Sequence, residues 1–599
     1  MAAGPAVGAT PAAPAQLLHF SSPGGRWVLL ASILGSGLAG IDATVVNVAL
    51  PTIGRDLGTD FAALQWTVTA YALTLASLIL LGGALGDRFG RRRVFLIGVA
   101  WFATASLLCG LAPSATLLIA ARALQGVGGA LLTPGSLAMI QSSFAPEDRS
   151  RAIGAWSGLG GVATAIGPFV GGFLVEHASW RWVFLINAPL AVVVVLVALR
   201  HVPETRGTTA TGHVDVLGGL LGVLGLGGIT YALIEAPSRG WSSPAVAGSA
   251  VVGVLTLIAF FVAEARERSP MLPLGIFRSS QFSAANAVTF VVYGAFGGVL
   301  FLLVLQLQIV AGFSPVVSGT ALLPVTVIML LFSARSGQLA ARIGPRLQMS
   351  VGPLIVACGL LLMLRIGAGA NYATDVLPAV IVLGAGLATM VAPLTSTALA
   401  AVDDEHAGIA SGVNNAVARA ASLIAVAVLP AAAGLTGAVY GDPAAFGHGF
   451  RIAITISSTL LVFGGALAAA LIRNDVLGSD DGGAPVLHCA VGAPPLIVRA
   501  GATAPCRHLP DLDLTTAPRT DGCETCLGEG TTWVSLRLCQ SCGRVGCCDS
   551  SPKQHATGHA TDTRHPVVRS FEPGENWFYC YPETLLFEVE GAPSAPSHS

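Results

Sequence analysis

Long apolar stretches, separated by short polar loops, run along the chain up to about residue 473. About 20 apolar residues in a helix suffice to cross the hydrocarbon layer of a bilayer, and about fourteen stretches reach that length. We therefore predict an all-α polytopic membrane protein. The expected spans are 27–50, 66–86, 94–112, 116–140, 152–175, 182–200, 214–235, 245–263, 282–306, 316–334, 346–366, 376–400, 408–437 and 450–472.

The loops between these spans differ in charge. If the N-terminus is cytoplasmic, the even-numbered loops are cytoplasmic too, and with the flanking segments they hold roughly fifteen arginines against about five in the opposite loops. This bias predicts a multi-pass protein of the plasma (inner) membrane with both termini in the cytoplasm. Residues 1–26 lack the charged start and compact apolar core of a cleavable signal peptide, so we expect a disordered cytoplasmic N-terminus.

Composition excludes several other classes of protein. Apolar residues make up 53% of the 599 residues and charged residues only 11%, and the formal net charge of −1 predicts no nucleic-acid partner. Lys553 is the only lysine, and this bias toward arginine suggests a GC-rich bacterial source. The sequence contains no nucleophile elbow and no phosphate-binding loop, so we do not expect an enzyme.

The first span carries Asp42 about two-thirds of the way along its length. A carboxylate at that depth costs at least about 2.5 kcal/mol, so it normally faces a cavity or a partner. Asp42 is interpreted either as a proton-coupling carboxylate or as a structural acid that stays paired with an arginine. Arg122, early in the fourth span, is the candidate partner, and its alternative role is that of an arginine whose head reaches the interface. Under the first interpretation, protonation of Asp42 loosens its contact with Arg122 and shifts the balance between two access states.

Two further segments have the composition of hinges and tight turns. The loop GGALGDRFGRRRV at 82–94 is echoed by SGQLAARIGPR at 336–346, and such an internal repeat is typical of secondary transporters. The fifth span contains Gly167-Pro168 and Gly171-Gly172, which allow a bend and close helix packing. Close packing alone could explain these residues, and a bend between two moving halves would explain them equally well.

Five motifs in order, IDATVVNVALP, GALGDRFGRRR, RALQGVGGALLTPGS, AIGPFVGGFL and SWRWVFLINAP, resemble the fourteen-helix drug:proton antiporters of the major facilitator superfamily. The resemblance covers about 27–473. It implies two six-helix bundles separated by two extra helices, and proton-driven efflux of hydrophobic compounds. By position it implies proton coupling at Asp42 and Arg122. It implies gating or conformational roles for Gly83, Gly86, Asp87, Arg88, Gly90, Arg91, Gln125, Gly126, Gly167, Pro168, Gly171 and Gly172.

The C-terminal half departs from some multidrug members of that family, which place further carboxylates in this bundle. Here the candidate acids lie at span ends or in loops, whereas Arg419 lies inside the thirteenth span. This pattern disfavours dicationic substrates and favours small hydrophobic ones that are neutral or monocationic. The acids in question are Asp375, Asp403, Asp404 and Glu405.

Eight of the eleven cysteines lie at or after Cys506, in a tail that is expected to be cytoplasmic and therefore reducing. Two CxxC pairs followed by histidines favour zinc over disulfide bonds. The predicted segments are a disordered N-terminus at 1–26, an N-terminal six-helix bundle at 27–200, extra helices at 201–281, a C-terminal six-helix bundle at 282–473, a flexible linker at 474–505, a small α+β zinc-binding domain at 506–590 and a disordered end at 591–599.

This tail resembles a ubiquitin-protease-type zinc finger. The resemblance implies two Zn²⁺ sites, and a third in which Glu583 stands where three-zinc members have a cysteine; Cys548 is left over. The implied sets are Cys523, Cys526, Cys547 and His555; Cys539, Cys542, His559 and His565; and, for the third site, Cys506, His508, Cys580 and Glu583.

Relatives of this finger often bind the free C-terminus of ubiquitin with an arginine and aromatic walls. Asp549 occupies the position expected for the arginine, so ubiquitin is disfavoured as a partner. Trp577, Tyr579 and Tyr581 are interpreted as pocket walls or as support for the zinc core. We expect a regulatory or protein-binding module that recognises a protein or peptide partner, such as another chain terminus. The whole chain is predicted to be a proton-coupled exporter. The alternatives are a membrane-anchored zinc-finger sensor or scaffold without transport activity, and an importer driven by proton symport.

Overall fold

The structure is a computed structural model that describes 18–206, 215–267, 270–402, 407–437, 441–477, 496–498, 506–508, 514–549, 551, 553–572, 575–583 and 585–589. Residues 1–17, 591–599 and most of the expected linker lie outside this part of the chain, as do Asp403, Asp404 and Glu405. The chain divides into two compact units, 1–478 and 479–599.

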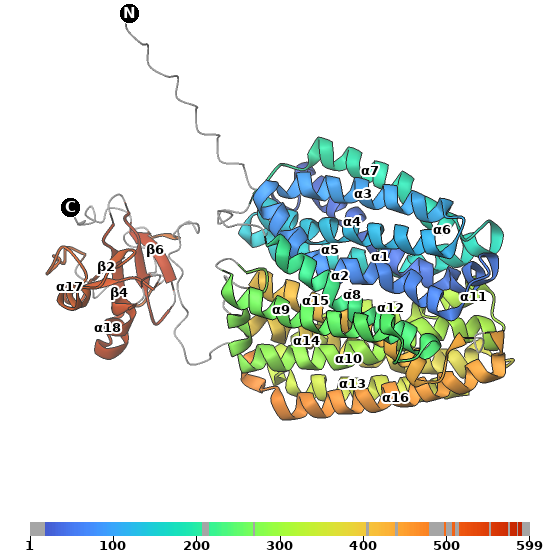
Figure 1. Cartoon of the computed structure of the whole chain (residues 1–599). Helices are drawn as coiled ribbons and strands as arrows, with labels where there is room; N and C mark the ends of the chain where they lie inside the picture. The colour runs from blue at the N-terminus through green and yellow to red at the C-terminus, as the bar shows by residue number, and fades with distance from the viewer. Residues whose placement is uncertain are drawn as a thin grey trace, which may run out of the picture. The chain divides into compact units, whose positions relative to one another are not determined.

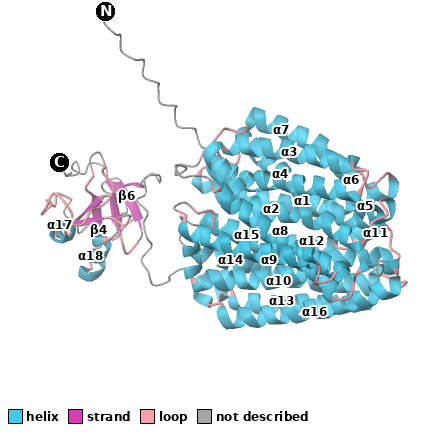
Figure 2. Ribbon diagram, viewed as in Figure 1, coloured by secondary structure: helices cyan, strands magenta, loops and turns pink. Residues whose placement is uncertain are grey.

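The named elements described in the first unit are all helices, joined by short loops (Figures 1 and 2). Fourteen of its helices or joined helical segments are long and apolar enough to cross a membrane, which confirms the predicted number of spans. The helices are α1 (Pro23–Asp56), α2 (Phe61–Phe89), α3 (Arg91–Leu111), α4 (Ala115–Ser143), α5 (Pro146–His177), α6 (Trp182–Leu185), α7 (Asn187–His201), α8 (Val216–Arg239), α9 (Pro244–Arg266), α10 (Ser280–Leu305), α11 (Pro315–Thr320), α12 (Leu323–Ile343), α13 (Arg346–Leu362), α14 (Leu377–Ala400), α15 (Ala407–Ala432) and α16 (Pro443–Leu471). Short turns of other helical types are η1 (Leu274–Arg278), η2 (Gln306–Val310), η3 (Met363–Arg365), η4 (Tyr372–Val376) and η7 (Asn474–Val476).

Local sequence explains where many of these helices begin. Asp60, Ser114 and Ser279 each accept a hydrogen bond from a backbone N–H in the first turn of α2, α4 and α10. The start of the chain differs from the expectation. Leu18 is bonded to the segment around Phe144, and α1 already begins at Pro23, so residues 18–26 are not part of a disordered lead-in.

The helices of this unit form two bundles and an inserted pair. In the first bundle α1 packs on α5 and α4 packs on both α2 and α3; in the second, α10 packs on α15 and α13 packs on α14 and α16. Figure 1 shows the two bundles as a blue-to-teal group and a green-to-orange group. The inserted helices α8 and α9 pack on each other, and α8 also lies against α2 and α15, so it contacts both bundles.

The two bundles approach each other closely at the end where α5 finishes. A Cβ on Gly172 would lie 2.5 Å from the Pro315 carbonyl oxygen, and Gln308 donates to the Val48 carbonyl at 3.0 Å. At the other end of α5, Gly154 and Gly158 have no neighbouring atom within 4 Å of where a Cβ would stand. The Gly172 and Gln308 contacts therefore hold the two halves together at the end where α5 finishes, whereas Gly154 and Gly158 stand free of described neighbours.

The described residues of the second unit form one six-stranded sheet and two short helices. The strands are β1 (Leu496–Val498), β2 (Leu536–Cys539), β3 (Val545–Cys547), β4 (Val567–Ser570), β5 (Phe578–Cys580) and β6 (Leu585–Val589), in the order β1-β6-β5-β4-β2-β3. The helices are α17 (Glu524–Glu529) and α18 (His555–Thr563). Because β1 pairs in parallel with β6, the expectation of a flexible linker is wrong at 496–498.

Candidate functional site

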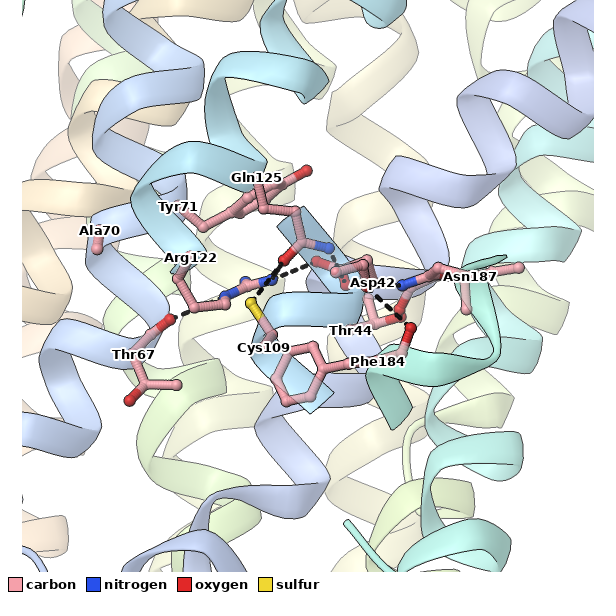
Figure 3. Close-up of polar contacts among 12 residues, drawn as sticks. Asp42, Thr44, Thr67, Ala70, Tyr71, Cys109, Arg122, Gln125, Phe184 and Asn187 are labelled. Carbon is pink, nitrogen blue, oxygen red and sulfur yellow. Dashed lines mark hydrogen bonds and ion pairs between the residues drawn. The ribbon is translucent and has the colours of Figure 1, made fainter. Parts of the chain in front are cut away.

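Asp42 lies in the interior of the first bundle and is fully buried. Three side chains donate hydrogen bonds to its carboxylate: Arg122 Nη1 to Oδ2 at 2.5 Å, Gln125 Nε2 to Oδ1 at 2.8 Å and Asn187 Nδ2 to Oδ1 at 3.0 Å. Figure 3 shows these three groups converging on Asp42. Such a set of donors stabilises the ionised carboxylate and compensates for the loss of hydration.

Arg122 is enclosed rather than extended toward an interface, with only 1% of its surface exposed. Its Nε donates to the Thr67 carbonyl at 3.0 Å and its Nη1 also donates to Gln125 Oε1 at 2.7 Å. The guanidinium lies over the Tyr71 ring, 4.4 Å from the centroid. The two candidate charges form a single buried ion pair, and both are held by further hydrogen bonds, which is the condition under which such a pair is tolerated.

The sequence interpretation did not single out Asn187 as a member of this site. Its amide donates to both Asp42 and the Ser106 hydroxyl, and it connects α7 and α3 to the acid on α1. Asn187 is the asparagine of the quoted SWRWVFLINAP motif. An amide within an otherwise apolar segment was the available signal, because a polar group in that environment needs a partner.

The motif residues at the end of α2 and the start of α3 are joined by a compact turn at Gly90. Asp87 Oδ1 accepts from Arg91 Nε at 2.8 Å, and Arg91 also reaches the Ala138 carbonyl on α4. Gly90 has φ +112°, a backbone conformation that favours glycine. Gly83 faces Pro134 and Gly86 lies near Arg91, while Arg88 rests on the ring of Phe89.

The glycine turn between α12 and α13 of the second bundle is built in the same way as the turn between α2 and α3. In the first bundle, the carboxylate of Glu204 accepts hydrogen bonds from the backbone N–H groups of Arg92 and Arg93, at the start of α3. Asn474 accepts in turn from the N–H of Arg346 at the start of α13, where Gly344 has φ +84°. In each half, a residue that follows the last helix of the bundle caps the helix after the glycine turn. The echo in sequence therefore corresponds to an equivalent structural arrangement.

The glycines of α4 and α5 lie where helices approach closely. A Cβ on Gly167 would meet Thr44 Oγ1 at 2.4 Å, and one on Gly171 would meet Val45 Cγ2 at 2.3 Å. Pro168 lies inside α5, and its carbonyl oxygen would be 2.1 Å from a Cβ on Gly319 of α11. Gly167 and Gly171 therefore set the packing of α5 on α1, while Pro168 contributes to its contact with the second bundle.

Gly126 allows the closest of the intrabundle contacts near Asp42. A Cβ there would lie 2.0 Å from Thr74 Oγ1 and 2.4 Å from the Tyr71 carbonyl oxygen. We expect Gly126→Ala to destabilise the protein by about 1–3 kcal/mol, the usual cost of overpacking. The matched control is Gly154→Ala, with open space around its Cβ, which should be neutral or slightly stabilising. Thermal unfolding in detergent compares the two, and equal melting temperatures would contradict the packing argument.

Three groups of cysteine, histidine and carboxylate side chains come together in the second unit. In each group one ligand atom per residue lies within 4.8 Å of all the others. The groups coincide with the three sets that the resemblance implied. They are Cys523, Cys526, Cys547 and His555; Cys539, Cys542, His559 and His565; and Cys506, His508, Cys580 and Glu583.

The first two groups fit a tetrahedral zinc ion. A site with Zn–S of about 2.3 Å and Zn–N of about 2.0 Å has S···N edges of about 3.5 Å and S···S edges of about 3.8 Å. In the first group His555 Nδ1 lies 3.4, 3.3 and 3.5 Å from the sulfurs of Cys523, Cys526 and Cys547. In the second, Cys539 Sγ lies 3.5 Å from His565 Nδ1, and Cys542 Sγ lies 3.2 Å from His559 Nε2.

The third group fits less well. His508 Nδ1 lies 3.4 Å from Cys580 Sγ but 3.9 Å from Cys506 Sγ and 3.8 Å from Glu583 Oε1. Glu583 Oε1 also forms an ion pair with Arg507 Nε at 2.9 Å. The carboxylate therefore has a competing partner, and an ion at this position would have to share it.

Burial favours the uncharged forms of several of these ligands. It raises the pKa of the Cys547 and Cys580 thiols to about 12 and that of Cys539 to about 11, and it lowers the pKa of His559. A zinc ion binds thiolates, so it would displace these thiol protons and cross-link strands and helices that share only a small core.

The three aromatic residues interpreted as pocket walls or as support for the zinc core differ in exposure. Tyr579 is buried, and burial raises its pKa to about 12. The Thr557 hydroxyl contacts both the Asp549 carboxylate and the Tyr581 hydroxyl, while Arg537 lies over the Trp577 ring. Burial of Tyr579 agrees with a role in supporting the core. Trp577 and Tyr581 are partly exposed, so both interpretations stay open for them.

Comparison with known proteins identifies both units. The family model for the Major Facilitator Superfamily matches residues 32–426, and the model for the Zn-finger in ubiquitin-hydrolases and other protein matches 523–588. The puromycin resistance protein of Streptomyces alboniger is 38% identical over 76% of this chain and 93% of its own. The multidrug resistance protein Stp of Mycobacterium tuberculosis (strain CDC 1551 / Oshkosh) is 36% identical over 67% of this chain and 74% of its own.

Solved structures agree on the fold. A bacterial homologue of the human lysosomal transporter Spinster, in an inward-facing conformation, superposes with a TM-score of 0.55 at 18% identity, covering 77% of this chain and 100% of its own. The peptide transporter POT superposes with a TM-score of 0.57 at 14% identity, covering 76% of this chain and 96% of its own. These neighbours are transporters and not enzymes. The chain is a multi-pass membrane protein of the Major Facilitator Superfamily, related to drug-resistance exporters and joined to a C-terminal zinc finger of the ubiquitin-hydrolase type.

Proposed function

We propose that the protein exports hydrophobic small molecules by alternating access, driven by inward movement of protons. The observation that carries this proposal is the buried Asp42–Arg122 ion pair, held by Gln125 and Asn187 inside a facilitator bundle. The carboxylate is the titratable group, and its hydrogen bonds link four helices of the bundle: α1, α4, α7 and, through Arg122, α2. Protonation would remove the negative charge that holds Arg122 and would loosen these four helices together.

The relatives support export as the direction of transport, since they are named as resistance proteins against puromycin and methylenomycin A. Within this proposal, both termini lie in the cytoplasm, the substrates are small hydrophobic molecules, and residues 27–200 and 282–473 form the two moving bundles. Residues 201–281 act as the inserted pair of helices.

The test is transport by purified full-length protein in sealed vesicles. An imposed pH gradient, acidic on the side opposite the tail, should drive accumulation of lipophilic probe compounds across the membrane, and collapsing the gradient should stop it. A scaffold or sensor without transport activity predicts no gradient-dependent movement of any probe. An importer predicts movement of probe in the same direction as the protons.

We also propose that the tail binds two zinc ions in the Cys₃His and Cys₂His₂ groups, with a third ion shared between Cys506, His508, Cys580 and Glu583. The zinc-supported sheet would then serve as a regulatory module that recognises a protein or peptide. Tail-deleted protein distinguishes regulation from recruitment: altered vesicle transport indicates regulation, and unchanged transport indicates recruitment.

A further inference from the structure

Arg419 is a second arginine at the middle of the membrane, and neither the ion pair nor the zinc groups involve it. It lies within α15, which runs alongside α2. Gln65 of α2 donates to the Val426 carbonyl at 2.8 Å, and a Cβ on Gly412 would touch Leu80 at 3.0 Å. Arg419 falls midway between these two contacts, and therefore at the level of Tyr71.

Tyr71 connects this position with the Asp42 site. Its ring is the one on which Arg122 rests, and its hydroxyl oxygen is buried without a hydrogen-bond partner. Arg419 lies close enough to Tyr71 for the two groups to interact electrostatically. The Tyr71 hydroxyl lies beside Gly129 of α4, so the first bundle supplies an unsatisfied hydroxyl and the second a guanidinium at one level of the contact between α2 and α15.

The charge of Arg419 has no counterpart in this region. Within the described residues, no hydrogen bond or ion pair reaches its guanidinium, and its Nε is enclosed without an acceptor. None of the acidic side chains described in α10–α16 is buried, and Asp375 is paired with Arg365. Asp42 is already neutralised by Arg122. Arg419 as a whole is half-buried, so its guanidinium is accessible to a bound anion, and a charge held there without a counterpart favours binding one.

We propose that Arg419, together with the Tyr71 hydroxyl, binds an anionic group of the transported molecule, a carboxylate or an acidic hydroxyl in its ionised form. This proposal rests on the transport function proposed above and narrows the substrate class. A planar guanidinium pairs with a carboxylate through two parallel hydrogen bonds, and the phenolic hydroxyl adds a third donor. A monocationic substrate would instead be repelled by the unpaired charge of Arg419, contrary to the expectation from sequence.

The test compares three probes of one shape: naphthalene-acetate, its neutral amide and naphthyl-ethylamine. Equilibrium dialysis with full-length protein in detergent measures the affinity for each. We expect wild-type protein to bind the acid best and the amine worst. Arg419→Gln should lower the ratio of acid to amide affinity by about 10- to 100-fold, the range for loss of a charge-assisted hydrogen bond. Arg419→Lys should keep part of the preference for the acid, because lysine keeps the positive charge but cannot form two parallel hydrogen bonds to a carboxylate.

Tyr71→Phe provides a second, milder variant, and it should lower the same ratio by about 2- to 10-fold. Equal losses for acid and amide in Arg419→Gln would show a structural role and overturn the proposal, as would wild-type protein without preference for the acid. The exporter proposal fails on a different measurement. If wild-type vesicles move no probe under a pH gradient while the acid preference persists, the anion site stands and the coupling to protons does not.

Discussion

Replacing Asp42 by asparagine is expected to abolish proton-driven export while leaving the two bundles assembled. The carboxylate accepts three hydrogen bonds, whereas an asparagine presents one oxygen and one N–H₂ donor to the same three donors. The variant therefore leaves Arg122 without a countercharge, and breaking a buried pair in this way costs about 3–5 kcal/mol. Vesicle transport under a pH gradient and thermal unfolding measure the two effects.

Two matched variants separate coupling from stability. Asp56→Asn makes the same change at the exposed end of α1, where the acid accepts from Trp180 Nε1, and transport should persist. The double variant Asp42→Asn/Arg122→Gln removes the uncompensated charge, so thermal stability should partly return while gradient-driven transport stays absent. Undiminished proton-driven transport by Asp42→Asn would remove this acid from the coupling role.

Removing zinc is expected to unfold the tail without unfolding the membrane unit. Structural zinc in small fingers supplies about 10–16 kcal/mol at neutral pH, as much as the entire net stability of an ordinary domain, which is about 5–15 kcal/mol. After chelation, residues beyond 478 should become sensitive to limited proteolysis while the helical unit stays intact. Elemental analysis of the purified full-length protein should find two to three zinc ions per chain before chelation.

Single substitutions assign the ions. Cys526→Ser should lower the zinc content by one ion and make the tail sensitive to protease. The reason is that the Cys526 sulfur lies against both Cys547 and His555, the other ligands of the first group. Cys548→Ser is the control, since this buried cysteine belongs to none of the three groups. Glu583→Ala should lower the zinc content only if the third group is filled. A zinc content unchanged by Cys526→Ser would contradict the assignment of the first group.

The membrane architecture could be predicted from sequence because the bilayer restricts the possible structures. A chain in hydrocarbon must form its backbone hydrogen bonds within each segment, so length and apolarity alone specify helices. The predicted fourteen spans agree with the structure to within several residues. The zinc groups were accessible for a related reason. Few side chains bind zinc, and a recognised spacing restricts how they can combine. The three sets inferred from resemblance are the three that the fold brings together.

Tertiary structure alone decided which distant residues meet. Asn187 and Asp42 are 145 positions apart, and no local pattern links an amide on α7 to an acid on α1. The capping of α3 by Glu204 and of α13 by Asn474, the pairing of Leu18 with the Phe144 segment, and the addition of β1 to the sheet are contacts of the same kind. The position of Arg419 opposite Tyr71 also depends on how α15 packs along α2. Hydrophobicity and ligand chemistry act along the chain and are readable there, whereas the pairing of buried polar groups depends on which helices become neighbours after folding.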